Sequence, residues 1–426
     1  MRSMGKRQKI LIIGGGFAGM NLAKLLDRRL YDVMVADRNN FHGFPPLFYQ
    51  IASSGLDASS IAFPLRREFK RYAHTSYHMG HVKNIDVYAK TVTTSYETIP
   101  YDKLVIAAGS TNNFFNMEGL SESVFGIKTV AEASHTRDEI LDRLERGALC
   151  KDPARRKELL SFLVVGGGPS GVEIAGALGE MKKEIVPREY PELNRDDVRI
   201  VLVEGSDRLL GAMGKRAGVK AKEYLEGLMV EVRLGTTMTD YSDKRVTFAD
   251  QSNEYWETVI WTAGVKGEPM PGLSGDVLGR GGRIRTDEYC RVKGLEDVYA
   301  IGDIALCETR ESPDGHPQVA QVAIQMAKFL AHNLNGKGSG QGFVYKDKGA
   351  MATIGKNRAV VEIKGRFMSG RLAWWMWMAV HLMSLAGMRN KLSVFMTWCW
   401  NYLTYGSSLR LLFRPSKFPV RRHWGD

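Results

Sequence analysis

Three glycines near the amino end have the spacing of a phosphate-binding turn. The segment KILIIGGGFAGMNLAKLL, residues 9–26, runs from an apolar stretch through Gly14, Gly16 and Gly19 into a helical pattern. Glycines in such a turn let backbone N–H groups approach a pyrophosphate, and the start of the helix adds partial positive charge. The next apolar stretch ends at Asp37, at the separation from the turn where a carboxylate is expected to accept both hydroxyls of an adenosine ribose.

The same pattern returns in the middle of the chain. FLVVGGGPSGVEIAGALGEM, residues 162–181, carries Gly166, Gly168 and Gly171, and the strand that follows ends at Glu204. A carboxylate there binds a free 2′-hydroxyl and repels a 2′-phosphate, which favours NAD over NADP. Two complete fingerprints imply two dinucleotides, and the usual pairing is one flavin with one nicotinamide.

Three further segments connect the two halves. YDKLVIAAGS (101–110) and WETVIWTAGV (256–265) are strands that end in small-residue turns, and EDVYAIGDIA (296–305) ends in Gly-Asp. This order implies a first nucleotide fold interrupted by the second. Asp303 is expected at a strand end, where a carboxylate accepts hydrogen bonds from a ribityl chain; a simple turn aspartate is the alternative.

Composition narrows the class of protein. With 426 residues, 44% hydrophobic and 25% charged, the chain has the profile of an ordinary globular protein of two or three domains. The four cysteines are scattered, which argues against a disulfide framework or a metal site and favours a reducing compartment. The start, MRSMGKRQKILIIGGG, runs into the glycine turn without a cleavage signal, so we expect a first strand there and not a signal peptide.

The carboxyl-terminal region is aromatic and basic. Five of the eight tryptophans lie between positions 374 and 400, three of them in WWMWM (374–378), and residues 366–426 carry nine Lys and Arg against one acid, Asp426. They therefore supply +8 of the net charge of +12. Nucleic-acid binding and membrane binding both fit such a segment. We favour an anionic membrane surface and no nucleic acid, because long apolar stretches separate the charges.

Two stretches of this region have the pattern of surface-lying helices. Residues 372–388 are mostly apolar and are interrupted by His381 and Ser384, and residues 392–405 place uncharged polar side chains on one helical face and apolar ones on the other. Such helices suit the membrane surface, where tryptophan prefers the headgroup level. A single membrane span, and a dimer or core interface, stay open as alternatives.

The order of these segments resembles the two-dinucleotide-binding-domain flavoproteins, and most closely the type II, non-proton-pumping NADH:quinone oxidoreductases. The resemblance covers almost the whole chain and is most specific at residues 39–66, 166–176, 320–325 and 381–406. It implies FAD in the first fold, NADH in the second, hydride transfer to flavin N5 and electron transfer to a membrane quinone.

Three residues are the catalytic candidates. The segment 317–334 is expected to be a helix begun by Pro317, with Gln321 and Gln325 on one face. Resemblance to an AQxAxQ quinone-site motif implies that these amides bind a quinone carbonyl; glutamines on a solvated face are the alternative. Glu173 is expected in the first helical turn, either as an acid favoured by the helix dipole or, as the resemblance implies, as a carboxylate near the nicotinamide–flavin contact.

We assign the remaining site residues to cofactor binding, with no metal. Those of the FAD fold are Gly14, Gly15, Gly16, Phe17, Ala18, Gly19, Asp37, Arg38, Val82, Ala108, Gly109, Asp303 and Ala320. Those of the NADH fold are Gly166, Gly168, Pro169, Ser170, Gly171, Glu204, Ala263 and Gly264.

Other members of the superfamily use other acceptors. A disulfide reductase needs a cysteine pair after the first acid, and residues 40–75 hold no cysteine. A sulfide:quinone reductase needs two cysteines beside the flavin. Cys150 lies in a basic linker, whereas Cys290 and Cys307 flank the Gly-Asp strand, and a fortuitous pair there stays open as a less favoured alternative. A soluble ferredoxin-type reductase would lack the apolar tail, and an NAD(H)-sensing flavoprotein similar to the apoptosis-inducing ones would spread its basic charge over the domains.

The sequence thus predicts an α/β protein with two nested Rossmann-like dinucleotide-binding domains and a C-terminal amphipathic helical membrane-binding region. The expected parts are 1–112 and 281–365 for FAD, 113–280 for NADH, and 366–426 for the membrane. We expect a peripheral, monotopic protein on the cytoplasmic face of a bacterial cell membrane. A homodimer stays open.

Overall fold

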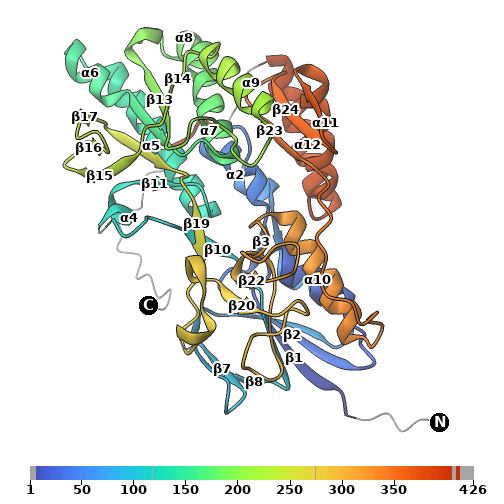
Figure 1. Cartoon of the computed structure of the whole chain (residues 1–426). Coiled ribbons are helices and arrows are strands. Elements are labelled where there is room, and N and C mark those ends of the chain that lie inside the picture. The colour runs from blue at the N-terminus through green and yellow to red at the C-terminus, as the bar shows by residue number, and fades with distance from the viewer. Residues whose placement is uncertain (1–5, 118, 274, 405–408, 413–426) are drawn as a thin grey trace.

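The computed structural model describes residues 6–117, 119–273, 275–404 and 409–412. The first fold lies at the bottom of Figure 1, the second at the upper left and the C-terminal helices at the upper right. The first fold is built on a parallel five-stranded sheet in the order β21-β9-β1-β2-β5. Its strands are β1 (Gln8–Ile13), β2 (Tyr31–Asp37), β5 (Thr75–Met79), β9 (Lys103–Ile106) and β21 (Val298–Ala300). Because β21 pairs with β9 only after the chain has passed through the whole second fold, the nested arrangement is confirmed.

The second fold occupies the intervening chain. Its parallel sheet has the order β11-β18-β12-β13-β14, and every residue of β12 is buried. Short antiparallel pairing of β10 (Ser110–Asn112) with β19 (Val265–Gly267) joins the two crossings between the folds. The sheet strands are β11 (Phe125–Gly126), β12 (Ser161–Val165), β13 (Arg199–Glu204), β14 (Glu231–Leu234) and β18 (Thr258–Trp261).

Smaller sheets and the helices complete the two folds. The remaining strands there are β3 (Phe41–Gly43), β4 (Ala62–Pro64), β6 (Val82–Asp86), β7 (Thr91–Thr94), β8 (Thr98–Pro100), β15 (Met238–Ser242), β16 (Arg245–Phe248), β17 (Asn253–Tyr255), β20 (Ile284–Thr286) and β22 (Ala305–Cys307). The helices are α1 (Phe17–Leu25), α2 (Phe48–Ala52), α3 (Leu65–Phe69), α4 (Leu120–Ser123), α5 (Val130–Leu149), α6 (Pro153–Leu159), α7 (Pro169–Glu180), α8 (Val186–Glu189), α9 (Lys215–Glu226) and α10 (Ala320–Leu334). The helix that was expected to start at Pro317 starts instead at Ala320, because Val319 before it has an extended backbone.

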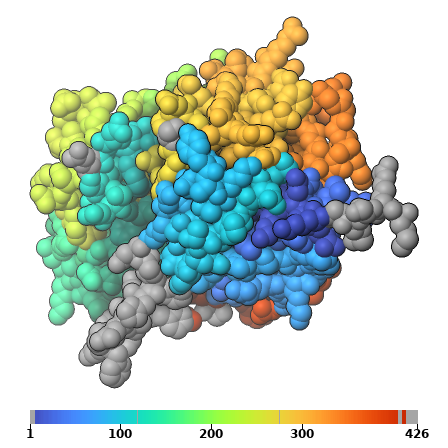
Figure 2. All heavy atoms as spheres, turned by 90° about the horizontal axis from the view of Figure 1, so that it is seen from below, coloured from blue at the N-terminus to red at the C-terminus, as the bar shows by residue number. Residues whose placement is uncertain are grey.

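A C-terminal unit packs against the second fold. It contains the antiparallel sheet of β23 (Ala350–Thr353), β24 (Ala359–Ile363) and β25 (Arg366–Ser369), and the helices α11 (Arg371–Ser384) and α12 (Met388–Thr404). Its β23 lies against α7, where a Cβ at Gly176 would come within 3.2 Å of the backbone of Ile354. The expected boundary at residue 366 falls inside this sheet, and the domain boundaries stay predictions. In Figure 2 the red of the helices emerges only along the lower edge, beside the blue of the first fold.

The WWMWM segment has one side in the core and one side on the surface. Trp377 and Trp398 are buried in one apolar cluster with α2, α5 and α7, whereas Trp375 is 52% exposed. The two helices therefore have one face in the core and one on the surface. No helix in the described ranges is both long enough and apolar enough to cross a membrane.

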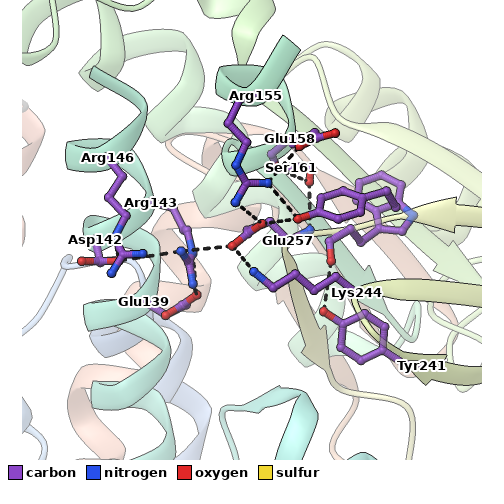
Figure 3. Close-up of polar contacts among 12 residues, drawn as sticks. Glu139, Asp142, Arg143, Arg146, Arg155, Glu158, Ser161, Tyr241, Lys244 and Glu257 are labelled. Carbon is purple, nitrogen blue, oxygen red and sulfur yellow. Dashed lines mark hydrogen bonds and ion pairs between the residues drawn. The ribbon is translucent and has the colours of Figure 1, made fainter. Parts of the chain in front are cut away.

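A buried acid holds the second fold together (Figure 3). The Glu257 carboxylate forms ion pairs with Arg143 of α5 at 3.1 Å, with Arg155 of α6 at 3.4 Å and with Lys244 of the β15–β16 turn at 2.5 Å. Burial alone would raise the pKa of Glu257, but hydrogen bonds from Lys244 and Tyr255 leave it below its ordinary value. A buried charge needs several partners. This cluster therefore holds α5 and α6 against the start of β18, which Glu257 directly precedes.

Candidate active site

At two positions of the first glycine turn only glycine fits. Gly14 has φ +104°, and a Cβ on it would lie 2.3 Å from the carbonyl oxygen of Ala107. A Cβ on Gly19 would lie 1.9 Å from the oxygen of Gly14, so α1 packs directly on the turn. A Cβ on Gly16 would meet no atom within 4 Å. The turn thus has one open side at the start of α1, where a diphosphate fits.

Asp37 lies beside this turn, at the end of β2. Its Oδ2 accepts the Gly15 N–H at 2.6 Å, its Oδ1 accepts the Asn39 N–H at 2.7 Å, and burial raises its pKa above the ordinary value. Each carboxylate oxygen keeps a lone pair for a ribose hydroxyl. The neighbouring Arg38 instead donates to Glu268 at 2.7 Å, and so ties the first fold to the chain returning from the second.

The other FAD candidates surround the same turn. Val82 is buried at the start of β6, and Ala108 and Gly109 come one residue after the end of β9. Ala18 lies 3.1 Å from a Cβ built on Gly302, and so Asp303 comes close to the start of α1. Asp303 accepts the Ser110 hydroxyl at 2.6 Å, and Ala320 begins α10. These positions suit a dinucleotide that runs from Asp37 past Gly16 to Asp303.

The second turn repeats the first. Gly166 has φ +109°, a Cβ on it would lie 2.8 Å from Ala263, and a Cβ on Gly171 would lie 1.8 Å from the Gly166 oxygen. A Cβ on Gly168 would meet open space, and Pro169 and Ser170 begin α7 there. The acid also matches, because Glu204 Oε2 accepts the Gly167 N–H at 2.6 Å.

The rim of the second turn carries an exposed aromatic residue. Gly264 has φ +101°, and the ring of Phe115 would touch a Cβ there at 3.0 Å. The chain that crosses from the first fold after β10 therefore passes directly over this rim.

Both candidate glutamines are hydrogen-bonded to backbone. The Gln321 amide donates to Gly349 O at 2.8 Å and accepts the Lys348 N–H at 3.1 Å. The Gln325 amide donates to Lys346 O at 2.9 Å and accepts the Lys346 N–H at 3.0 Å. The pair therefore latches α10 to the segment that leads into β23. A quinone at these amides would have to replace those bonds, and their catalytic role stays a prediction.

Glu173 has an environment that the sequence did not indicate. It is the fifth residue of α7, so the expected place in the first helical turn is wrong. Its side chain accepts the Thr353 N–H at 3.5 Å, and burial raises its pKa to about 8. It lines an open cavity of about 190 Å³ between α2, α7, α11 and α12, with Tyr49, Trp377 and Trp398 among the walls. A carboxyl that is neutral at pH 7 gains little from the helix dipole.

An aromatic chain links the first turn to the C-terminal helices, and of its members the sequence predicted a site role only for Phe17. The Phe17 ring contacts those of His42 at 5.3 Å and Phe44 at 5.6 Å, Phe44 contacts His381 at 6.2 Å, and His381 stacks on Trp377 at 4.1 Å. Burial lowers the pKa of His42 and of His381 to about 4, so both rings are neutral at pH 7. The sequence signals were the aromatic FHGF segment, which follows soon after the first acid, and the WWMWM segment that contains Trp377.

Comparisons with known proteins agree with this geometry. The family described as pyridine nucleotide-disulphide oxidoreductase matches residues 8–327, and the NDH2 C-terminal domain matches residues 348–405. The type II NADH:quinone oxidoreductase Ndh of Mycobacterium tuberculosis is 32% identical over 418 residues, which are 94% of this chain and 89% of that protein.

Solved structures share the fold. NDH2 of Plasmodium falciparum in complex with NADH has a TM-score of 0.87 at 20% identity, over 95% of this chain and all of that one. The sulfide:quinone oxidoreductase of Aquifex aeolicus has a TM-score of 0.71 at 17% identity, over 90% and 92% of the two chains. The family match spans both glycine turns and the C-terminal unit. The chain belongs to the type II NADH:quinone oxidoreductases.

Proposed function

We propose that this protein oxidises NADH held by the second turn and reduces a membrane quinone through FAD held by the first. Bound FAD supplies the carrier that accepts a hydride and releases electrons to the quinone. The main support is that contacts between aromatic rings connect the two ends of the site. The first glycine turn, the aromatic chain from Phe17 to His381 and the surface helices form one connected path.

The residues of the second turn favour NADH over NADPH. Glu204 lies at the end of β13, and its Oε1 accepts both the N–H and the hydroxyl of Ser206, at 2.8 and 2.7 Å. These bonds orient the carboxylate toward the rim of the turn. A 2′-phosphate there would meet a negative charge, whereas a ribose hydroxyl could donate to the lone pair that Oε2 keeps beside its bond from Gly167.

The quinone headgroup is proposed to approach along the aromatic chain. Neutral His381 holds its Nδ1 2.7 Å from the Trp377 carbonyl oxygen, which makes Nδ1 the donor and leaves Nε2 as an acceptor. Phe44 and Trp377 on either side of the ring supply apolar walls for a headgroup. Gln321 joins this site only if its amide leaves Gly349.

The outer face of α11 and α12 is proposed to lie on the cytoplasmic surface of a bacterial membrane. Met383, Met388 and Leu403 are 70%, 71% and 79% exposed, an apolar face that water disfavours. A quinone with an apolar tail stays in the bilayer, and this face would bring the enzyme to it. A second copy of the chain could also cover the face, as a homodimer.

Two measurements test the proposal. In anaerobic stopped flow, NADH should bleach the flavin absorbance and a short-chain quinone should restore it. Reoxidation by a ferredoxin but not by quinone would contradict the assignment. For the membrane face, Met396→Ser with Leu403→Ser should lower vesicle binding without loss of flavin. Surface substitutions are preferable to truncation, because Trp377 and Trp398 belong to the core. Unchanged vesicle binding with a lost dimer would assign the face to self-association.

A further inference from the structure

A short helix of the first fold presents an unbalanced basic surface. Leu65 and Phe69 of α3 are buried in the first core, and Glu68 is paired with Lys24 at 2.7 Å. The exposed positions within residues 65–71 are all cationic: Arg66, Arg67, Lys70 and Arg71. Within the described ranges, no carboxylate oxygen lies within 4 Å of Arg67, Lys70 or Arg71. We call these four residues the α3 basic cluster.

The residues just before this cluster in the chain lie next to the amino end of α12. The Asn390 amide donates to Ala62 O at 2.9 Å, Ser393 Oγ is 3.0 Å from Ser60 Oγ, and a Cβ at Gly387 would lie 2.4 Å from the Phe63 ring. Strand β4 ends at Pro64, and α3 follows at once. Arg67 is five residues from Ala62, so chain geometry keeps their Cα atoms within about 18 Å.

The neighbouring end of α12 carries the exposed apolar face. Met388 and Leu392 are 71% and 58% exposed, and Arg389 between them is exposed as well. The apolar face and the α3 basic cluster therefore flank the same contact, the one between the start of α12 and residues 60–63, and come from different domains. Figure 2 agrees, since the blue of the first fold meets the red of the C-terminal helices along one edge.

We infer that the α3 basic cluster is a second membrane contact that binds anionic lipid headgroups, beside the apolar contact of α11 and α12. The inference rests on the proposed membrane location. Apolar insertion is indifferent to lipid charge, whereas each Lys or Arg near an anionic surface strengthens binding about five-fold at low salt. Three such cations therefore contribute about 100-fold, and salt removes the effect.

Two separate contacts also fix the tilt of the enzyme on the membrane. The Leu65 side chain lies 2.5 Å from a Cβ built on Gly15, so α3 touches the first glycine turn directly. A membrane contact on α3 therefore sets the distance between the flavin site and the bilayer.

The test uses the full-length, flavin-loaded enzyme and the triple variant Arg67→Gln, Lys70→Gln, Arg71→Gln. Arg66 is left in place because its guanidinium lies 5.2 Å above the Tyr77 ring. The matched control, Lys151→Gln, Lys157→Gln, Arg245→Gln, changes three exposed cations near α6 and β16, on the opposite side of Figure 1 from α12. Flotation is measured with phosphatidylcholine vesicles and with vesicles that also contain phosphatidylglycerol, at low and high salt.

We expect the triple variant to bind the anionic vesicles about 100-fold more weakly at low salt, with unchanged binding to neutral vesicles and unchanged flavin content. The control variant should behave as wild type. Equal binding of the triple variant and wild type to anionic vesicles would overturn the inference, and so would flavin loss in the triple variant, which would assign the cluster to the cofactor. If wild type binds neither kind of vesicle, the proposed membrane location itself fails.

Discussion

The two glycine turns are nearly identical, but the helices that follow them pack against different parts of the molecule. In both turns the residue after the first glycine donates its N–H to the ribose acid at 2.6 Å, Gly15 to Asp37 and Gly167 to Glu204. Two residues beyond the third glycine, α1 carries Asn21 and α7 carries Glu173. The Asn21 amide bonds back to Phe17 O within its own helix at 2.7 Å, whereas Glu173 turns toward Thr353 of the C-terminal unit.

The difference between Asn21 and Glu173 follows from the packing partners of the two helices. The local turn needs only glycine geometry, so both copies keep it. The outer face of α1 packs on α10 of the same fold, while α7 packs on β23 and shares the cavity with α2, α11 and α12. Of the two helices that follow the glycine turns, α7 is therefore the one that packs on the C-terminal unit.

The largest expected effect separates the two turns. Gly19→Val should abolish FAD retention, because its Cβ would lie 1.9 Å from the Gly14 oxygen. Gly171→Val should leave FAD bound and weaken NADH binding at least about 100-fold, since the same overlap displaces α7 from its own turn. Flavin absorbance and NADH titration of purified protein measure the two losses. Loss of FAD in both variants would mean that the turns are not independent.

The second prediction concerns pH and the different residues after the turns. Folded Glu173 keeps its proton up to about pH 8, whereas its ordinary pKa in an unfolded chain is 4.5. Unfolding therefore releases a proton between these values, and the free energy of unfolding should fall by about 3–5 kcal/mol as pH rises from 5 to 8.

Glu173→Gln should flatten that fall, because the amide does not titrate. Glu223→Gln, at an exposed position of α9, is the control and should keep the wild-type slope. Urea unfolding at pH 5, 6.5 and 8 gives the three slopes. A wild-type slope in Glu173→Gln would mean that another group carries the pH dependence.

The two turns were predictable from sequence because they are local. In each case the glycines, the helix and the acid belong to one strand–turn–helix–strand unit, and their geometry follows from backbone sterics. The Glu173–Thr353 contact joins residues 180 apart, and the Gln321 latch depends on where the chain after α10 folds back. Such contacts leave no periodic signal. The WWMWM segment was ambiguous for a related reason: its helix buries Trp377 and exposes Trp375, so core and surface patterns overlap.

The third prediction asks whether the latch is the whole role of the two glutamines. In a Gln321→Ala, Gln325→Ala double variant, reduction of the flavin by NADH should stay near the wild-type rate. Reoxidation by quinone should slow about 10- to 100-fold, the effect of one lost hydrogen bond in an apolar site. Ferricyanide, which needs no such contact, should be reduced almost normally.

Thermal unfolding of the same double variant supplies the control. If the melting temperature falls while both half-reactions keep their rates, the amides serve only to hold residues 346–349. If the NADH step slows and the quinone step does not, the quinone site lies elsewhere.

The smallest expected effect comes from neutralising the two acids that follow the turns, Glu204 and Asp37. Glu204→Gln should raise the KM for NADH about 10-fold, because a charge-assisted hydrogen bond to a ribose hydroxyl becomes a neutral one. The same change removes the charge that repels a 2′-phosphate, so activity with NADPH should rise toward that with NADH. Asp37→Asn, the matching change in the first turn, should leave the NADH preference untouched and weaken FAD instead. Steady-state rates with both nucleotides and flavin content of both variants measure these effects. Should the wild-type enzyme already use NADPH as well as NADH, the carboxylate of Glu204 is not the selecting group, and the likeness of the two turns would end at their glycines.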